Sequence, residues 1–188
     1  MAIRPIIEVP APVLSAVAAA VVDVDNSIRT LLDDMAQTMF AAPGIGLAAP
    51  QVGVSQRVIV TAVPVRDGIS EEQESDPESE KAWVTEVVNP VIVERGGAIR
   101  CEEGCLSLPE VTVEVDRSEY VVIEGLDRHG DPLRFEARGF YAVVFQHEID
   151  HLDGITLLSS LSTLKRVLYL KKLKKLQRDG SGPTSGAP

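Results

Sequence analysis

Hydrophobic positions in the first half of the chain follow first a helical and then a strand-like pattern. Between residues 26 and 42, apolar side chains recur every three or four positions, which predicts an amphipathic helix. Asn26 or Ser27 is a suitable N-cap for this helix, and Pro43 followed by Gly44 is a typical stop. β-branched residues dominate positions 57–63 and predict a strand there.

In the second half of the chain, several strand-like segments precede one long apolar segment. Positions 83–94 and 119–126 are predicted strands, and the second leads through a polar turn into 133–137, as in a hairpin. Positions 140–152 are apolar almost all round, which predicts a helix buried on several sides and ended by Gly154. Runs of strands with few helices between them favour an α+β fold over a doubly wound sheet.

The end of the chain has a weaker pattern. Leu157, Leu161, Leu164 and Leu168 have the spacing of one helical face, so we expect a helix that packs at its start and projects at its end. Residues 179–188 are rich in glycine, serine and proline and are predicted to form a flexible tail. We therefore expect a single domain over 1–178.

Composition narrows the class of protein. The chain has 188 residues, of which 45% are hydrophobic and 24% charged, values typical of a globular domain and not of a disordered or disulfide-dense chain. No apolar stretch approaches the roughly 20 residues needed to span a bilayer, and the start lacks the apolar core of a signal peptide. With only two cysteines, the expected compartment is the cytoplasm, with both thiols reduced.

Charge is unevenly distributed. The net charge is −10, yet residues 165–178 contain seven Lys or Arg and no acid. Residues 66–81 are acidic and are predicted to form an exposed loop. A basic segment on an acidic protein indicates a localised surface that docks on a polyanion, although a solvated helix face has the same composition.

The strongest chemical signal is the sequence His-Glu-Ile-Asp-His at 147–151, on the predicted buried helix. Histidines four positions apart lie on one helix face and can bind a single metal ion, while Glu148 can act as general base toward a water molecule. The alternative is a pair of hydrogen-bonded core histidines beside a surface glutamate. The apolar character of the helix favours the metal site, because buried unpaired polar groups are costly.

Two histidines leave a catalytic tetrahedral site one protein ligand short. His129 lies in the predicted hairpin turn, where a solvated side chain is expected. Cys105 follows Gly104, whose missing side chain would allow the backbone to pass close to a neighbour, and is the better candidate ligand. Cys101 is a competing thiol in a less distinctive setting.

A third block, Gly-Ile-Gly-Leu-Ala-Ala-Pro-Gln at 44–51, is rich in small residues. It could be only a tight connection between helix and strand. It lacks the lysine and the following helix expected of a phosphate-binding loop. Gln51 instead offers a neutral amide donor suited to an oxyanion hole.

Together these blocks resemble the peptide deformylases. GIGLAAPQ (44–51), EGCLS (103–107) and QHEIDHLDG (146–154) are similar to the three signature motifs of that family, in the same order. The likeness begins at PAPVL (10–14) and extends to about Leu176. It implies an α+β fold in which antiparallel sheets surround the central motif helix, followed by a C-terminal helix.

The resemblance also implies a role for each site residue. Cys105, His147 and His151 would bind one Fe²⁺ per chain, which Ni²⁺, Zn²⁺ or Co²⁺ can replace. Glu148 would act as acid and base, with the Gln51 amide and the Leu106 backbone N–H stabilising the oxyanion. The implied substrate pocket consists of small and apolar residues: Ile45, Gly46, Gly104, Phe140, Val143 and Val144.

The resemblance implies a substrate and a partner as well. The substrate would be the N-formyl group on the initiator methionine of nascent peptides, and hydrolysis would release formate. The ribosome would be the polyanion that residues 165–178 bind. A monomer with no membrane attachment is expected.

Several positions depart from the family pattern. Thr112 and Asp116 stand where the family often has Arg and Pro, Ser15 stands where a basic residue is common, and the loop 66–81 is long. These departures affect substrate handling more than the metal centre and indicate a divergent member. Two other functions fit parts of the pattern: a metallopeptidase using the same helix motif, and a catalytically idle ribosome-binding module.

Overall fold

The structure is a computed structural model that describes residues 2–65, 69–70 and 83–178. The predicted tail 179–188 lies outside these residues, as does the predicted acidic loop 66–81 except for Ile69 and Ser70. Within the described ranges, no helix has the length and apolarity required to cross a membrane.

The larger of two sheets has six strands and contains every strand that the hydrophobic pattern predicts. Its strand order is β1-β2-β4-β7-β8-β3, with antiparallel pairs throughout except for the parallel pair of β3 and β8. The strands are β1 (Gly46–Ala48), β2 (Val58–Thr61), β3 (Ile69–Ser70), β4 (Thr85–Gly96), β7 (Tyr120–Leu126) and β8 (Pro132–Arg138). The predicted hairpin is confirmed as β7 and β8, and the α+β class is confirmed.

A separate two-stranded sheet pairs β5 (Ile99–Cys105) with β6 (Leu108–Arg117). The sequence pattern does not predict these strands, because glutamates and glycine interrupt their apolar positions. Their register places Gly104 opposite Thr112 and Cys105 opposite Leu108. Three residues of β6 therefore bulge out of the ladder at this point.

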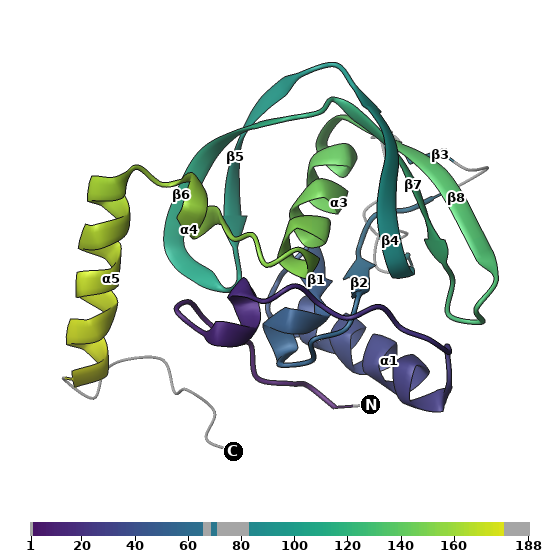
Figure 1. Cartoon of the computed structure of the whole chain (residues 1–188), viewed down its shortest axis with the longest axis horizontal. Helices are drawn as coiled ribbons and strands as arrows, with labels where there is room; N and C mark the ends of the chain where they lie inside the picture. Colours follow the sequence, from purple (N-terminus) through teal and green to yellow (C-terminus); the bar gives the residue numbers. More distant parts are fainter. Residues whose placement is uncertain (1, 66–68, 71–82, 179–188) are drawn as a thin grey trace.

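Helix α3 (Gly139–Leu152) is the predicted buried helix and runs through the centre of the molecule, between the β5–β6 pair and the larger sheet (Figure 1). Ala142, Phe145 and Leu152 pack with the inner face of the six-stranded sheet in one hydrophobic cluster. The helix ends where predicted, because Gly154 adopts φ +74° and a Cβ there would lie 2.8 Å from the carbonyl oxygen of Ser15.

Helix α1 (Asn26–Ala41) confirms the first predicted helix but not its cap. The N-cap is Asp25, whose carboxylate accepts hydrogen bonds from the backbone N–H groups of Ser27 and Ile28. Asn26 and Ser27 are already helical, and an N-cap side chain must precede the first helical residue. The apolar face of α1 packs on β1 and β2.

The C-terminal segment differs from the prediction. Leu157 and Leu161 are buried, whereas Leu164 and Leu168 are 69% and 57% exposed. The backbone is extended at Leu161, so the segment divides into α4 (Leu157–Ser160) and α5 (Thr163–Arg178), and the leucines do not share one helix face. Helix α5 lies outside β6 (Figure 1) and is packed there by a different pair of side chains, Tyr169 and Leu173.

The described residues also include two short 3₁₀ helices, Pro12–Ser15 and Ala49–Val52. The second follows β1 directly, so the small-residue block 44–51 forms a strand and a tight turn. Residues 46–51 of this block are buried and contact α1 and α3, which brings Gln51 into the interior.

Candidate active site

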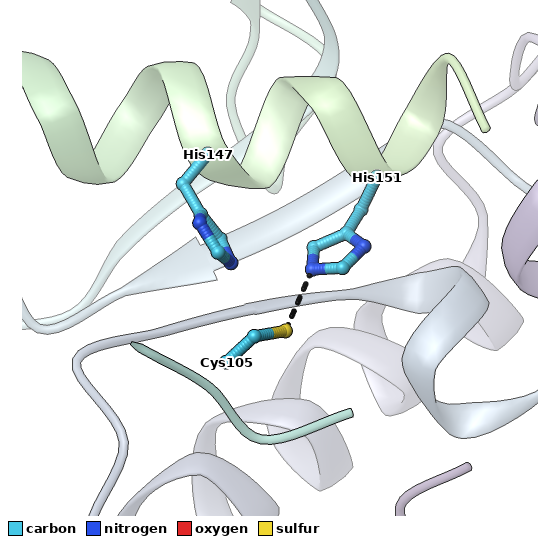
Figure 2. Close-up of side chains that lie close together, drawn as sticks. All are labelled: Cys105, His147 and His151. Atoms are coloured by element: carbon cyan, nitrogen blue, oxygen red, sulfur yellow. Dashed lines mark hydrogen bonds between the residues drawn. The ribbon is translucent and has the colours of Figure 1, made fainter. Parts of the chain in front are cut away.

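One cysteine and two histidines converge at the centre of the molecule. Cys105 is the last residue of β5, and His147 and His151 lie on successive turns of α3, so their rings project from one helix face toward the thiol (Figure 2). One ligand atom from each of the three residues lies within 4.8 Å of the other two. His151 Nε2 is 3.2 Å from Cys105 Sγ.

A buried ionic network holds the first histidine. His147 Nδ1 is 2.8 Å from a carboxylate oxygen of Glu103, and the same carboxylate accepts two hydrogen bonds from Arg117, at 2.7 and 3.0 Å. Arg117 also donates to Asp150 on α3 at 2.5 Å. Since Nδ1 is engaged with Glu103, Nε2 of His147 is left for a metal ion.

Glu103 and Arg117 are functional residues that the sequence argument missed. A signal for Glu103 was available, because strand side chains alternate and a residue two positions before Cys105 lies on the same face. Hydrogen bonds from His147 and Arg117 outweigh the effect of burial and lower the pKa of Glu103 to about 2. The Glu103 carboxylate is therefore ionised and orients the His147 ring.

His147 and His151 have different electrostatic surroundings. Burial disfavours the charged form of both, but hydrogen bonds with Cys105 and Glu103 raise the pKa of His147 to about 10. Burial lowers the pKa of His151 to about 3. A cation bound at the three donor atoms would displace the proton on Nε2 of His147 and leave the Nδ1–H bonded to Glu103.

The second ring nitrogen of His151 faces away from the thiol (Figure 2). This Nδ1 atom is buried and has no hydrogen-bond partner among the described residues. A small cavity of about 90 Å³ adjoins the ring and is lined in part by Asp150, Thr156 and Ser160. Nε2, which is 3.2 Å from Cys105 Sγ, is therefore the ring nitrogen of His151 that faces the other two donors.

Glu148 lies between the two histidines in sequence and is 4% exposed. A Cβ at Gly46 would lie 2.3 Å from Glu148 Oε1, so the absence of a side chain at Gly46 makes room for the carboxylate. Burial raises the pKa of Glu148 to about 7. The carboxyl group can therefore both accept and donate a proton near neutral pH.

Gln51 is held by its own turn and is 1% exposed. Its side-chain oxygen accepts a hydrogen bond of 2.8 Å from the backbone N–H of Ala48. This bond turns the amide nitrogen toward Ser107 Oγ at 3.2 Å and Cys105 Sγ at 3.6 Å. The amide N–H₂ thus lies beside the candidate metal centre as a fixed donor.

A cavity of about 560 Å³ opens beside these groups, a volume suited to a small ligand. It brings together all of the residues predicted for the site except His151, which adjoins the smaller cavity. The predicted residues that line it are Ile45, Gly46, Gln51, Gly104, Cys105, Leu106, Phe140, Val143, Val144, His147 and Glu148.

The structure also places three further residues considered in the sequence analysis: Cys101, His129 and Gly104. Cys101 lies away from the histidines, with Sγ 3.7 Å from Glu103 Oε1 and 3.8 Å from the Val115 carbonyl oxygen. His129 is exposed in the β7–β8 turn, as predicted. The expected close backbone approach at Gly104 is wrong, because a Cβ there would meet only Thr112 Cγ2, at an ordinary 3.9 Å. The glycine whose missing side chain makes room for a neighbouring group is Gly46, which lies against Glu148.

Comparison with known proteins agrees with this geometry. The sequence model of the family described as polypeptide deformylase matches residues 3–167. The chain belongs to the polypeptide deformylase family. It is 47% identical over 180 residues to a peptide deformylase of Alkalilimnicola ehrlichii, an alignment covering 96% of this chain and 94% of that protein. Peptide deformylases are metal-dependent enzymes that remove the N-formyl group from nascent peptides.

Solved deformylase structures have the same fold. A peptide deformylase from Legionella pneumophila superposes with a TM-score of 0.81 at 39% identity, covering 97% of this chain and 100% of the other. A peptide deformylase from Ehrlichia chaffeensis in complex with actinonin gives 0.82 at 38% identity, covering 95% and 99%. The fold and family predicted from the three motifs are confirmed.

Proposed function

We propose that this deformylase hydrolyses the formamide of N-formylmethionyl peptides with Cys105, His147 and His151 as its metal ligands. The observation that carries the proposal is the convergence of these three donors beside a cavity that also contains a buried carboxyl group and a fixed amide. The chain thus offers the ligands, the acid–base group and the space for a peptide in one place.

The donor set fits the proposed metal ion. Its donor atoms are mutually close, one imidazole is oriented by a carboxylate, and the other is kept neutral by burial. One thiolate and two imidazoles suit Fe²⁺, which we propose as the native ion with one per chain, and equally Co²⁺, Ni²⁺ or Zn²⁺. When bound, the ion would supply Lewis-acid activation of water and of the formyl carbonyl.

Glu148 is the proposed proton carrier. Its pKa of about 7 places the carboxyl group near the optimum for proton exchange at neutral pH. It would accept a proton as a water molecule attacks the formyl carbon, and then deliver this proton to the departing amine. Its burial against Gly46 holds the carboxylate in place without a hydrogen bond to Oε2, which has no partner among the described residues.

Gln51 and Leu106 are the proposed oxyanion donors. The hydrogen bond from Ala48 fixes the Gln51 amide, so its N–H₂ needs little reorganisation when charge develops on the formyl oxygen. Leu106 follows the ligand Cys105 directly and lines the same cavity, so its backbone N–H is the second proposed donor.

The proposed methionine pocket is the apolar wall of the cavity. Val143 and Val144 are buried on α3, while Ile45 and Phe140 are about 40% exposed at the opening. Such a wall suits the flexible thioether side chain of methionine. Gly46 and Gly104 add surfaces without side chains, along which a peptide backbone can lie.

We also infer the setting in which the enzyme acts. Residues 165–178 are proposed to dock on ribosomal RNA, supported by their seven positive charges and the absence of acids. We propose that 1–178 form one domain, that the protein is a monomer, and that it works in the cytoplasm, where its two free cysteines would stay reduced.

The deciding experiment uses formyl-Met-Ala-Ser and protein purified without oxygen. We expect stoichiometric formate release with the peptide bonds intact; cleavage of a peptide bond would indicate a metallopeptidase, and no reaction an idle binding module. Metal analysis of Cys105→Ala, His147→Ala and His151→Ala should show loss of the ion. Cys101→Ala is the matched control and should keep it, whereas full occupancy in Cys105→Ala would refute the ligand assignment.

A further inference from the structure

One wall of the cavity of about 560 Å³ is in contact with the C-terminal helix α5. Residues 109–111 of β6 line the cavity, and they are the residues that the register leaves out of the β5–β6 ladder, between the pairs Cys105–Leu108 and Gly104–Thr112. We call residues 109–111 the rim segment. Because the pairing register of β5 and β6 passes over these residues, contacts outside the ladder contribute to their position.

The rim segment has an unusual backbone. Glu110 adopts φ +62°, in the left-handed region that residues other than glycine rarely adopt. Such a conformation persists only where the surroundings hold it. The segment is therefore a part of the cavity wall that depends on its neighbours.

Tyr169 of α5 contacts the rim segment and restrains its position. Its hydroxyl donates a hydrogen bond of 3.2 Å to the carbonyl oxygen of Pro109, the first residue of the rim segment. The Tyr169 ring is buried in the cluster that contains Leu108, Val113 and Leu173, so its direction is fixed. Burial together with Glu8 and Glu110 raises the pKa of Tyr169, which keeps the hydroxyl protonated and able to donate.

We propose that Tyr169 is a positioning residue for substrate binding, holding the rim segment where it contacts the substrate residues that follow formylmethionine. The inference rests on the proposed function of the cavity. With the methionine side chain on the apolar wall of α3, as proposed above, the β6 residues that line the same cavity are left for the rest of the peptide. A displaced rim segment would weaken binding of long substrates without changing the reacting groups around Cys105 and Glu148.

The test compares Tyr169→Phe with the parent enzyme on two substrates. Formyl-Met-Ala-Ser reaches past the methionine, whereas formylmethionine amide ends there. Loss of one hydrogen bond should raise the KM for the tripeptide about threefold to tenfold. The KM for the amide, the kcat for both substrates and the metal content should stay unchanged.

Tyr120→Phe is the matched control, because it removes a tyrosine hydroxyl on β7, away from the rim segment, and should leave both KM values unchanged. An unchanged tripeptide KM in a folded, metal-loaded Tyr169→Phe variant would overturn the inference, even if the variant melted at a lower temperature. Equal changes for both substrates would also overturn it. Failure of the parent enzyme to release formate would instead refute the proposed function of the cavity.

Discussion

At the scale of single residues, burial determines the chemistry of Glu148. A carboxyl group in water ionises near pH 4, but this one projects from α3 into the interior against Gly46 of β1, and burial raises its pKa to about 7. The same burial would be a structural defect in a protein without catalytic function, since Oε2 has no hydrogen-bond partner in the part of the chain that is described.

Glu148→Gln should remove proton transfer and keep the metal site. Glutamine has nearly the same shape, so packing against Gly46 is retained, but it cannot carry the proton between water and amine. We expect kcat to fall by about 10²–10⁴-fold, measured by formate release. Metal content should equal that of the parent enzyme, and near-normal turnover would exclude Glu148 from the mechanism.

Gly46→Ala tests the space on the other side of the same carboxylate. The added methyl would lie 2.3 Å from Glu148 Oε1, closer than real contacts, so Glu148 must shift. We expect at least a tenfold loss of kcat with the metal retained, because a small displacement of a catalytic group is costly. Gly104→Ala is the matched control for kcat, since its methyl meets only Thr112 at 3.9 Å and its place in the cavity wall affects KM; equal losses of kcat in both variants would contradict this explanation.

The sequence could predict the residues of the site better than the contacts that orient them. His147, Glu148 and His151 follow from helical spacing, and Cys105 from the need for a further ligand. The link from His147 through Glu103 to Arg117 joins α3 to two strands that the pattern did not predict. Partners that meet only through tertiary structure leave no periodic signal in the sequence.

At the scale of elements, the sequence predicted those whose burial is regular. Helices α1 and α3 and the strands β2, β4, β7 and β8 have clear apolar periodicity, and their bounds differ from the predicted ones by a few residues at most. Strands β5 and β6 expose one face and contain the bulge, so their pattern is broken. The C-terminal prediction failed because a single extended residue, Leu161, places the leucines before and after it on separate helices.

Strand β6 also presents Thr112 at the wall of the cavity. Thr112 is exposed, and its hydroxyl donates to the Glu102 carboxylate on the neighbouring strand. An arginine in this place could reach a peptide carbonyl that threonine cannot. Such a contact is made equally in the ground and transition states and therefore affects KM more than kcat.

We expect Thr112→Arg to lower the KM for formyl-Met-Ala-Ser by about tenfold, equivalent to a charge-assisted hydrogen bond of roughly 1.5 kcal/mol, with kcat little changed. Thr112→Val is the matched control: it removes the bond to Glu102, adds no donor, and should leave KM near the parent value. Steady-state kinetics decide the matter. An unchanged KM in folded, metal-loaded Thr112→Arg would mean that position 112 has no part in holding the peptide.

At the scale of the whole molecule, α5 combines two faces. Tyr169 and Leu173 pack inward, while Lys165 and Lys171 are exposed. Reversing the two exposed charges therefore leaves the packing intact. We expect Lys165→Glu with Lys171→Glu to weaken co-sedimentation with ribosomes and to flatten its dependence on salt, because each lost phosphate contact reduces the number of counterions released.

Turnover of formyl-Met-Ala-Ser by this double variant should match that of the parent enzyme, which serves as the control for folding. Glu94→Lys with Glu124→Lys, on exposed residues of β4 and β7, adds positive charge elsewhere. This second variant shows whether net charge alone governs the interaction. Undiminished co-sedimentation of the α5 variant would exclude Lys165 and Lys171 from the docking surface.

The ligands also have a consequence for the integrity of the fold. Cys105 belongs to the two-stranded sheet and His151 to the helix packed on the six-stranded sheet, 46 residues further along the chain. An ion bound by both residues, as proposed, would stabilise the folded state, because the unfolded chain does not hold these donors together. The stabilisation depends on the concentration of the ion and amounts to about 4 kcal/mol at a thousand times its Kd.

Chelation of the ion should therefore lower the melting temperature, measured by differential scanning fluorimetry, and re-addition should restore it. The contacts of Glu103 with His147 and of Arg117 with Asp150 still join the smaller sheet to α3, so the apoprotein should loosen without unfolding. Faster amide hydrogen exchange should be confined to β5 and β6, and uniform acceleration across both sheets would contradict this expectation. The ion proposed to activate the substrate would then also stabilise the packing of the smaller sheet against α3.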